Sequence, residues 1–336
     1  MTVITRHPLF HDPAYPSSET LDGEQKALVV EFNRRAQTGE LAFITPPQCL
    51  CGGTEFDQVA TYDRYRIWQP VSLCRHCGLM ACRPRMANDT IAWFYGSDVY
   101  RRLYNSDRML PHTPDKFLAR AESMSWRRDT IKTSVDYDRV ERVGEIGCGA
   151  GWNLWAFHQD GKSVVGVDYS PELTAAGRAM GMDIRQGTME ALAGERFDVL
   201  ILSHVLEHMP DPAEALAQGA ELLAENGVFY IEVPDARDIC LGMFQSAHVW
   251  YFTPTRLRHL AASVGLEAIA EKSYGGVHFG LTFRRATKVE TPALAGEYEV
   301  MRGIIRRFER REMVKDWLRR LGLFDLGRRF YRLLRR

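Results

Sequence analysis

Three glycines at every second position are the clearest sign of chemistry in this sequence. The segment VGEIGCGAGW contains a β-rich run through Glu145, followed by Gly147, Gly149 and Gly151 and then by the helix-like run NLWAF. Glycines allow a tight turn and a close approach to a ligand, because no Cβ atom stands in the way. A dinucleotide-binding loop would have its third glycine one residue later. The spacing therefore favours a different nucleotide-like ligand.

The elements around this loop predict an α/β fold. After Val140, the β-rich runs RVERVGEIG, KSVVGVD, FDVLILS and GVFYIEVP alternate with helical runs, which is typical of a doubly wound parallel sheet. The segments LEAIAEKSY and VHFGLTF predict two closing strands and a hairpin at the sheet edge. Asp168 ends the second run, 21 residues after Gly147, where its carboxylate can bind the two hydroxyls of a ribose.

From Val140 to Phe283 the chain resembles the class I S-adenosylmethionine-dependent methyltransferases. Four segments agree in order: the glycine loop, GVDYSPE with Asp168, QGTMEAL, and FDVLILSHVLEHMPDP. The resemblance implies a Rossmann-like, seven-stranded methyltransferase sheet that binds S-adenosylmethionine. The implied cofactor-binding residues are Glu145, Gly147, Gly149, Gly151, Asp168, Thr188, Met189 and Ser203. Thr188 stands where relatives have an aspartate for the adenine amino group, so we expect that contact to be weaker or to be made by backbone at Thr188 and Met189.

Two further segments contain candidate catalytic residues. A helical turn beginning near Ser203 would place His204, Glu207 and His208 on one face. Similar-looking quinone O-methyltransferases hold a divalent metal with acidic and histidine side chains of this turn. The alternative is that Glu207 and His208 fix the loop by hydrogen bonds, and we favour it because His204 stands where those enzymes have an acid.

The segment AHVWYFTPTRL resembles a His-x-x-x-Phe-Thr/Ser-Pro segment of small-molecule methyltransferases that faces the acceptor. We expect its His248 to be the general base, since an imidazole can take a proton from a hydroxyl near neutral pH. The alternative is that His248 packs under Trp250 and Phe252.

Four cysteines predict a structural zinc site. Cys49 and Cys51 lie in PPQCLCGG and Cys74 and Cys77 in SLCRHCGL, and glycines after each pair suit a knuckle that directs two thiolates at one ion. The first pair is spaced C-x-C instead of the usual C-x-x-C, so His76 and Cys82 are possible substitutes, and four unmetallated cysteines are the alternative. The segment resembles an N-terminal zinc-binding module found in some bacterial sugar and secondary-metabolite methyltransferases.

Composition sets the wider limits. The 336 residues are 45% hydrophobic and 26% charged, which predicts about two globular domains and excludes a wholly disordered chain. No apolar run approaches ~20 residues and the N-terminus lacks a signal-peptide pattern, so we expect a soluble, cytoplasmic protein. Seven cysteines, an odd number, fit a reducing compartment better than a disulfide framework.

The zero net charge hides an asymmetry. Residues 301–336 carry thirteen basic and four acidic residues, a net +9, so the first 300 residues carry −9. Such a body does not offer the basic face that nucleic acid needs, and we do not expect a nucleic-acid partner. From Leu323 on, the pattern predicts a basic amphipathic helix. In the helix before it, the apolar residues begin on one side with Met301–Phe308 and continue on another side with Val314, Trp317 and Leu321. Docking on its own chain or a dimer partner is the first interpretation of 301–336, peripheral binding to the inner membrane face is the second, and nucleic acid is the least favoured.

These patterns divide the chain into five parts. They are a lead-in with one helix (1–45), a zinc-binding module (46–86), a helical lid (87–135), the methyltransferase domain (136–290) and the basic helical tail (291–336). The expected reaction is O-methylation of a small-molecule, sugar or lipid-linked glycan acceptor. The alternatives are an RNA methyltransferase that uses the zinc module for RNA, and a non-catalytic scaffold that binds the cofactor without turnover.

Overall fold

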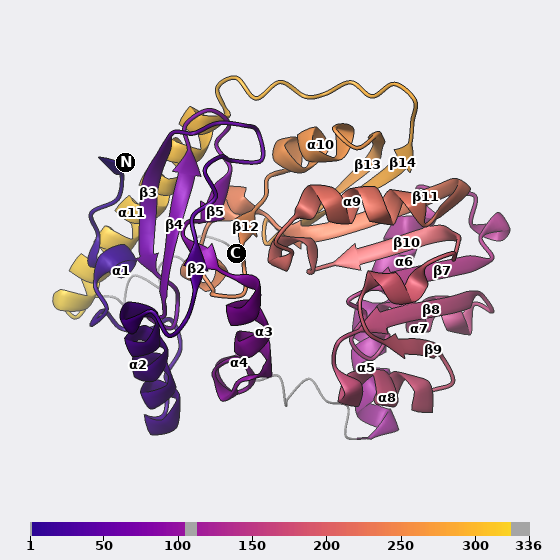
Figure 1. Cartoon of the computed structure of the whole chain (residues 1–336), viewed down its shortest axis with the longest axis horizontal. Coiled ribbons are helices and arrows are strands. Elements are labelled where there is room, and N and C mark those ends of the chain that lie inside the picture. Colours follow the sequence, from indigo (N-terminus) through magenta and orange to yellow (C-terminus); the bar gives the residue numbers. More distant parts are fainter. Residues whose placement is uncertain (1, 105–112, 324–336) are drawn as a thin grey trace. The chain divides into compact units, whose positions relative to one another are not determined.

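The computed structural model describes residues 2–104 and 113–323, which form two compact units (Figure 1). Within these residues, the first unit comprises 2–87, 237–246 and 295–323, and the second comprises 88–236 and 247–294. No helix of the described part is long and apolar enough to cross a bilayer.

A seven-stranded sheet organises the second unit. Its strands are β7 (Arg142–Ile146), β8 (Ser163–Asp168), β9 (Asp183–Gln186), β10 (Phe197–Ser203), β11 (Leu223–Pro234), β13 (Leu266–Tyr274) and β14 (His278–Arg285). Their order is β13-β14-β11-β10-β7-β8-β9, and β14 runs antiparallel to both of its neighbours. The predicted Rossmann-like sheet and its closing hairpin are confirmed. The short edge strand β9 adds a seventh strand that no β-rich run in the sequence had marked.

The strand order explains the placement of the helices. These are α7 (Trp152–Gln159), α8 (Pro171–Ala179), α9 (Pro212–Glu221) and α10 (Pro254–Ala262). From β7 the chain adds β8 and β9 toward one edge of the sheet, and from β10 it adds β11 toward the other edge. Because both sets of crossovers are right-handed, α7 and α8 lie on the face of the sheet opposite α9. The point of reversal lies between β7 and β10, and side chains at the carboxyl ends of these strands lie next to each other.

Within the described residues of the second unit, four helices precede the sheet in the sequence: α3 (Asn88–Gly96), α4 (Asp98–Leu103), α5 (Pro114–Met124) and α6 (Trp126–Lys132). Phe117 and Ala121 of α5 and Ile131 of α6 are buried in the core formed with α7 and strands β7 and β8. Helices α5 and α6 are therefore part of the sheet's core rather than of a separate lid, because their apolar stripes face the sheet. This differs from the expected lid over 87–135.

A smaller sheet organises the first unit. Strands β1 (Thr2–Val3), β3 (Phe56–Tyr62), β4 (Trp68–Cys74) and β5 (Met80–Cys82) pair in this order, and β2 (Phe43–Ile44) pairs with β6 (Arg85–Met86). Helix α2 (Gly23–Thr38) is the helix predicted within 1–45, and it ends before Gly39, whose φ of 78° is left-handed. A second, shorter helix in the lead-in, α1 (Pro8–His11), buries Leu9 and Phe10.

The long helix α11 (Glu297–Arg320) belongs to the first unit. It buries the stripe Met301, Ile304, Ile305 and Phe308, and its Tyr298 hydroxyl donates to Asp57 on β3 at 2.6 Å. The first part of the C-terminal segment therefore docks on its own chain. The amphipathic helix predicted from Leu323 on lies outside the described residues.

Candidate functional site

The glycine loop follows β7 and turns sharply into α7. Gly147, Gly149 and Gly151 all have left-handed φ values, of 67°, 57° and 82°. A Cβ atom on Gly147 would lie 2.4 Å from a methyl carbon of Val205, which follows β10. Glycine is thus required at this position both by backbone conformation and by the close approach of the loop after β10.

Asp168, at the end of β8, holds this loop in place. One of its carboxylate oxygens accepts from the Gly149 amide at 2.8 Å and the other accepts from the Ser170 amide at 2.9 Å. Each carboxylate oxygen has a second lone pair, so the group can still accept bonds from a ligand. Thr188 lies beside this strand end, because the Gly187 amide donates to the Asp168 carbonyl at 2.9 Å. Met189 begins the 3₁₀ turn η3 (Met189–Leu192).

Glu145 supplies a buried carboxyl group beneath the loop. Its side chain is 1% exposed, one oxygen accepts from the Asn153 amide group at 2.6 Å, and the other has no hydrogen-bond partner in the described chain. Burial raises the pKa of Glu145 to about 8. A buried polar atom without a partner is costly, so it indicates a missing partner, and a cationic donor such as an ammonium group of a ligand would favour the ionised carboxylate.

The loop after β10 brings three histidines around one buried carboxylate. Glu207 Oε1 lies 3.5 Å from His204 Nδ1, 3.8 Å from His208 Nε2 and 4.0 Å from His248 Nε2. The helical turn is the 3₁₀ turn η4 (Leu206–His208), not a turn beginning at Ser203, because His204 adopts a left-handed φ of 55°. The predicted grouping of His204, Glu207 and His208 is nevertheless present, and His248 joins it from the segment before β12 (Trp250–Tyr251).

The charge state of this group follows from its neighbours. Burial raises the pKa of Glu207, but His204, His208 and His248 outweigh it and hold it at about 2. Burial lowers the pKa of His204, but Glu207 and Glu232 raise it to about 9, so His204 is an imidazolium at neutral pH. Each of its ring nitrogens faces one of these carboxylates, as Nε2 lies 2.9 Å from Glu232 Oε1.

His208 and His248 differ in access. The His208 side chain is 25% exposed and that of His248 is 7% exposed. His208 Nδ1 lies 2.8 Å from the Ala247 carbonyl oxygen, which can only accept, so Nδ1 carries the hydrogen and Nε2 is free to accept a proton. Tyr95 of α3 places its hydroxyl 3.2 Å from the same ring.

A second network, near the carboxyl end of β11, was not expected from the sequence. Glu232, fully buried on β11, accepts two hydrogen bonds from Arg127 of α6, both at 2.7 Å, and a third from Tyr230 at 3.1 Å. His278, at the start of β14, lies 3.3 Å from Glu232 Oε1. Arg127, Glu232 and His278 stand far apart in the sequence. Only Glu232 was marked by a sequence pattern, as a charged residue within the apolar run GVFYIEVP.

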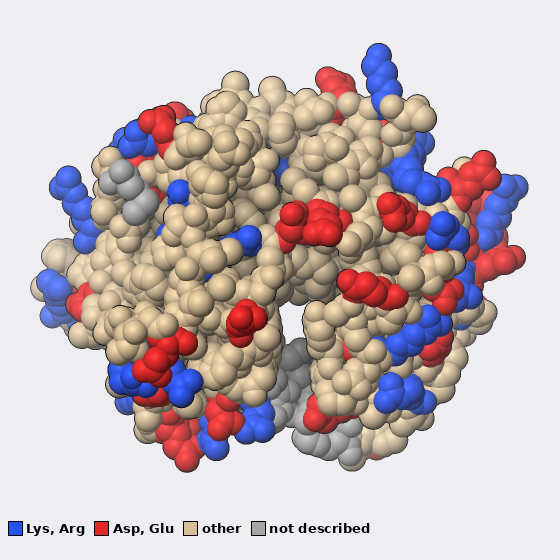
Figure 2. All heavy atoms as spheres, in the orientation of Figure 1, with Lys and Arg blue, Asp and Glu red and all other residues tan. Residues whose placement is uncertain are grey.

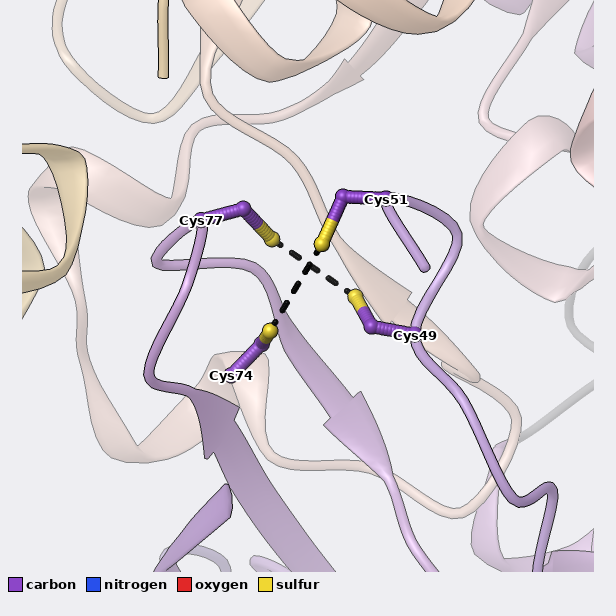
Figure 3. Close-up of side chains that lie close together, drawn as sticks. All are labelled: Cys49, Cys51, Cys74 and Cys77. Atoms are coloured by element: carbon purple, nitrogen blue, oxygen red, sulfur yellow. Dashed lines mark hydrogen bonds between the residues drawn. The ribbon is translucent and has the colours of Figure 1, made fainter. Parts of the chain in front are cut away.

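The four predicted zinc ligands converge in the first unit, as Figure 3 shows. Cys49 Sγ lies 3.6 Å from Cys77 Sγ, and Cys51 Sγ lies 3.7 Å from Cys74 Sγ. Four thiolates at about 2.3 Å from a tetrahedral zinc ion would lie about 3.8 Å apart. The donor set and its spacing thus fit zinc, and neither His76 nor Cys82 belongs to the group among the described residues.

Comparisons with known proteins agree with this geometry. Residues 115–271 match a family model described as "Methyltransferase domain". The chain contains a methyltransferase domain. The predicted resemblance to class I S-adenosylmethionine-dependent methyltransferases is confirmed for this part of the chain.

Sequence relatives include a ubiquinone biosynthesis O-methyltransferase from Cereibacter sphaeroides, 31% identical over 153 residues that cover 39% of this chain and 62% of the relative. The corresponding protein from Xylella fastidiosa is 32% identical, covering 36% and 52%. The match thus spans less than two thirds of these relatives. Similar solved structures include an S-adenosylmethionine-dependent methyltransferase from Mesorhizobium loti (16% identical, TM-score 0.41, covering 47% and 96%) and the CcbJ methyltransferase from Streptomyces caelestis (14%, 0.39, 47% and 87%).

Proposed function

We propose that this protein transfers the methyl group of S-adenosylmethionine to an oxygen atom of a small-molecule acceptor. The observation that carries the proposal is the convergence of the glycine loop, Asp168 and the unpartnered oxygen of Glu145 at the point where the strand order reverses. The O-methyltransferase names of the sequence relatives support oxygen as the accepting atom. Sugars and lipid-linked glycans remain the finer acceptor classes that we propose.

The cofactor would be held by residues of three strand ends. Asp168 would accept bonds from the ribose hydroxyls, the Gly147–Gly151 loop would leave room for the ligand backbone, and Glu145 would face its ammonium group. Backbone at Thr188 and Met189 and the end of β10 at Ser203 complete the proposed set. The bound cofactor supplies a methyl group already attached to a good leaving group, so the protein's main task is to align the two reactants.

We assign the proton to His208. As the new oxygen–carbon bond forms and the carbon–sulfur bond breaks, the acceptor hydroxyl loses its proton to His208 Nε2. Glu207, 3.8 Å from this nitrogen, stabilises the imidazolium that results. His248, the expected base, is less accessible and lies beside His208 with its Nε2 4.0 Å from Glu207 Oε1, while His204 fixes the loop between its two carboxylates.

A divalent cation at Glu207 is the second candidate. Both carboxylate oxygens of Glu207 are buried without a hydrogen-bond partner in the described chain, and Glu207, His208 and His248 offer ligand atoms within 4.8 Å of one another. Two histidines and one carboxylate are a familiar donor set for transition metals. Activity that is lost on metal removal and restored by one added ion would favour the cation over a purely positioning role.

We also propose that Cys49, Cys51, Cys74 and Cys77 bind one structural zinc ion. Four thiolates leave no open coordination position, so the ion would stabilise the first unit and take no part in methyl transfer. On the face drawn in Figure 2, acidic and basic side chains are interspersed, which gives no support to RNA as the acceptor.

The test of the proposed function is turnover. Purified protein is incubated with methyl-labelled S-adenosylmethionine and a panel of phenols, sugars and prenyl-linked glycans, and labelled products are identified by mass spectrometry. We expect an O-methylated product that is absent with Asp168→Ala and with His208→Ala. Cofactor binding without transfer to any acceptor would favour the non-catalytic scaffold instead.

A further inference from the structure

The second half of α11 exposes an apolar face that its own unit does not cover. The side chains of Met313, Val314, Trp317 and Leu321 are 54%, 56%, 61% and 51% exposed. At 100° per residue, these four positions fall within an arc of about 100° on one side of the helix. The helix therefore has two apolar stripes, one buried against the first unit near its start and one exposed near its end.

Arginines extend the same side of the helix. Arg306, Arg307 and Arg310 are exposed one to two turns before Met313, and Arg320 stands at the edge of the arc near the helix end. None of these four guanidinium groups forms an ion pair with another described residue.

The acids of this half of the helix are engaged elsewhere. Glu309 accepts from the backbone amides of Arg6 and His7, Glu312 pairs with Lys315, and Asp316 accepts from the Tyr15 hydroxyl. Two of these contacts are made to the start of the chain, so the negative charges face the first unit. The exposed side is left with a basic half and an apolar half.

We propose that this face of α11 binds the surface of an anionic lipid bilayer. Tryptophan is favoured at the boundary between headgroups and acyl chains, and aliphatic side chains beside it enter the acyl region. The arginines on the same face pair with the phosphates of the headgroups. Because the helix lies in the plane of the bilayer surface, their long side chains can reach out of the acyl region toward the headgroups and water. This inference is independent of the proposed methyl transfer.

Charge distinguishes lipid from the other occupants. A second copy of the chain would bring the unpaired arginines of two like-charged faces together in a two-fold interface, and their repulsion opposes association. The remaining residues, 324–336, contain five arginines and one aspartate, so they carry the same sign as the face and would repel it. An anionic bilayer satisfies both halves, because its phosphates pair with the arginines and its acyl region accepts the apolar side chains.

The experiment is sedimentation of the full chain with vesicles of phosphatidylcholine alone and of phosphatidylcholine with phosphatidylglycerol. We expect binding to the anionic vesicles only, weakening as salt is raised. Trp317→Ser combined with Leu321→Ser should abolish it, and Arg306→Gln combined with Arg310→Gln should weaken it about fivefold per arginine. In the wild type, brominated lipid should quench emission that is missing in Trp317→Phe.

Matched controls lie on helix α2 of the same unit. Val30→Ser removes another exposed apolar side chain and Lys26→Gln another exposed charge, and both should bind as wild type. Unchanged circular dichroism and an unchanged free energy of unfolding in all variants show that the first unit is intact.

Three outcomes would overturn the proposal. One is failure of the wild type to bind anionic vesicles at low salt. A second is binding that disappears with Arg332→Gln and Arg335→Gln but is unaffected by the α11 variants, which would assign it to the last residues. The third is a dimer in sedimentation velocity that Trp317→Ser dissociates, which would make the face a contact between two copies.

Discussion

Replacing Asp168 by alanine tests the assignment of the cofactor site most directly. The carboxylate accepts from the Gly149 and Ser170 amides, and in our proposal it also accepts from two ribose hydroxyls. A hydrogen bond to a charged group contributes about 1.5–3 kcal/mol, so losing both ribose bonds should raise the dissociation constant by roughly 10² to 10⁴. Isothermal titration calorimetry with S-adenosylhomocysteine measures this change.

Part of the loss could come from the loop, since Asp168 also positions Gly149. A second ligand separates the two effects: 2′-deoxy-S-adenosylhomocysteine lacks one of the hydroxyls. The wild type should bind it about tenfold or more weakly than the parent compound, whereas Asp168→Ala should bind both equally. Asp183→Ala, which removes an acid from the neighbouring edge strand, is the control and should behave as wild type. Equal discrimination by wild type and Asp168→Ala would refute the ribose assignment.

Three further predictions concern other parts of the chain. Gly147→Ala should weaken cofactor binding and destabilise the fold by about 1–3 kcal/mol, because residue 147 has a left-handed φ and its new Cβ would lie 2.4 Å from Val205. Calorimetry measures the cofactor affinity and denaturant unfolding measures the stability. Adding Val205→Ala should restore part of both losses. Cys74→Ser should lower the zinc content from about one equivalent to none and expose residues 46–85 to protease. His204→Gln should lower the free energy of unfolding by about 1 kcal/mol at pH 6, after allowance for the 40% exposure of the His204 side chain, and by less as the pH rises through 9.

The sign of the last effect follows from the raised pKa of His204. A group whose pKa is about 9 in the folded protein and about 6.5 in the unfolded chain stabilises the fold fully below pH 6.5 and loses this contribution as the pH passes 9. A wild-type advantage that grew with pH would contradict the assigned imidazolium. Protein that is fully stable without metal would contradict the zinc site, and unchanged cofactor affinity in Gly147→Ala would contradict the loop assignment.

The sequence alone determined the methyltransferase sheet and the four cysteines. Alternating β-rich and helical runs, the spacing of Gly147, Gly149 and Gly151, and the acid at Asp168 are local patterns, and a parallel sheet brings successive strand ends to one edge. The paired cysteines likewise carry their spacing within two short knuckles, which identified them as ligands, but only the fold of the first unit brings Cys49 to Cys77 and Cys51 to Cys74.

Tertiary structure decided what lies around these motifs. Arg127 and His278 are separated in sequence from Glu232 by 105 and 46 residues, and no local pattern predicts that they share one buried carboxylate. The division of α11 into a buried and an exposed stripe also depended on packing, because the first unit covers only the part of the helix that it reaches. Spacing fixes which side chains share a face, but only packing determines which face is left to solvent.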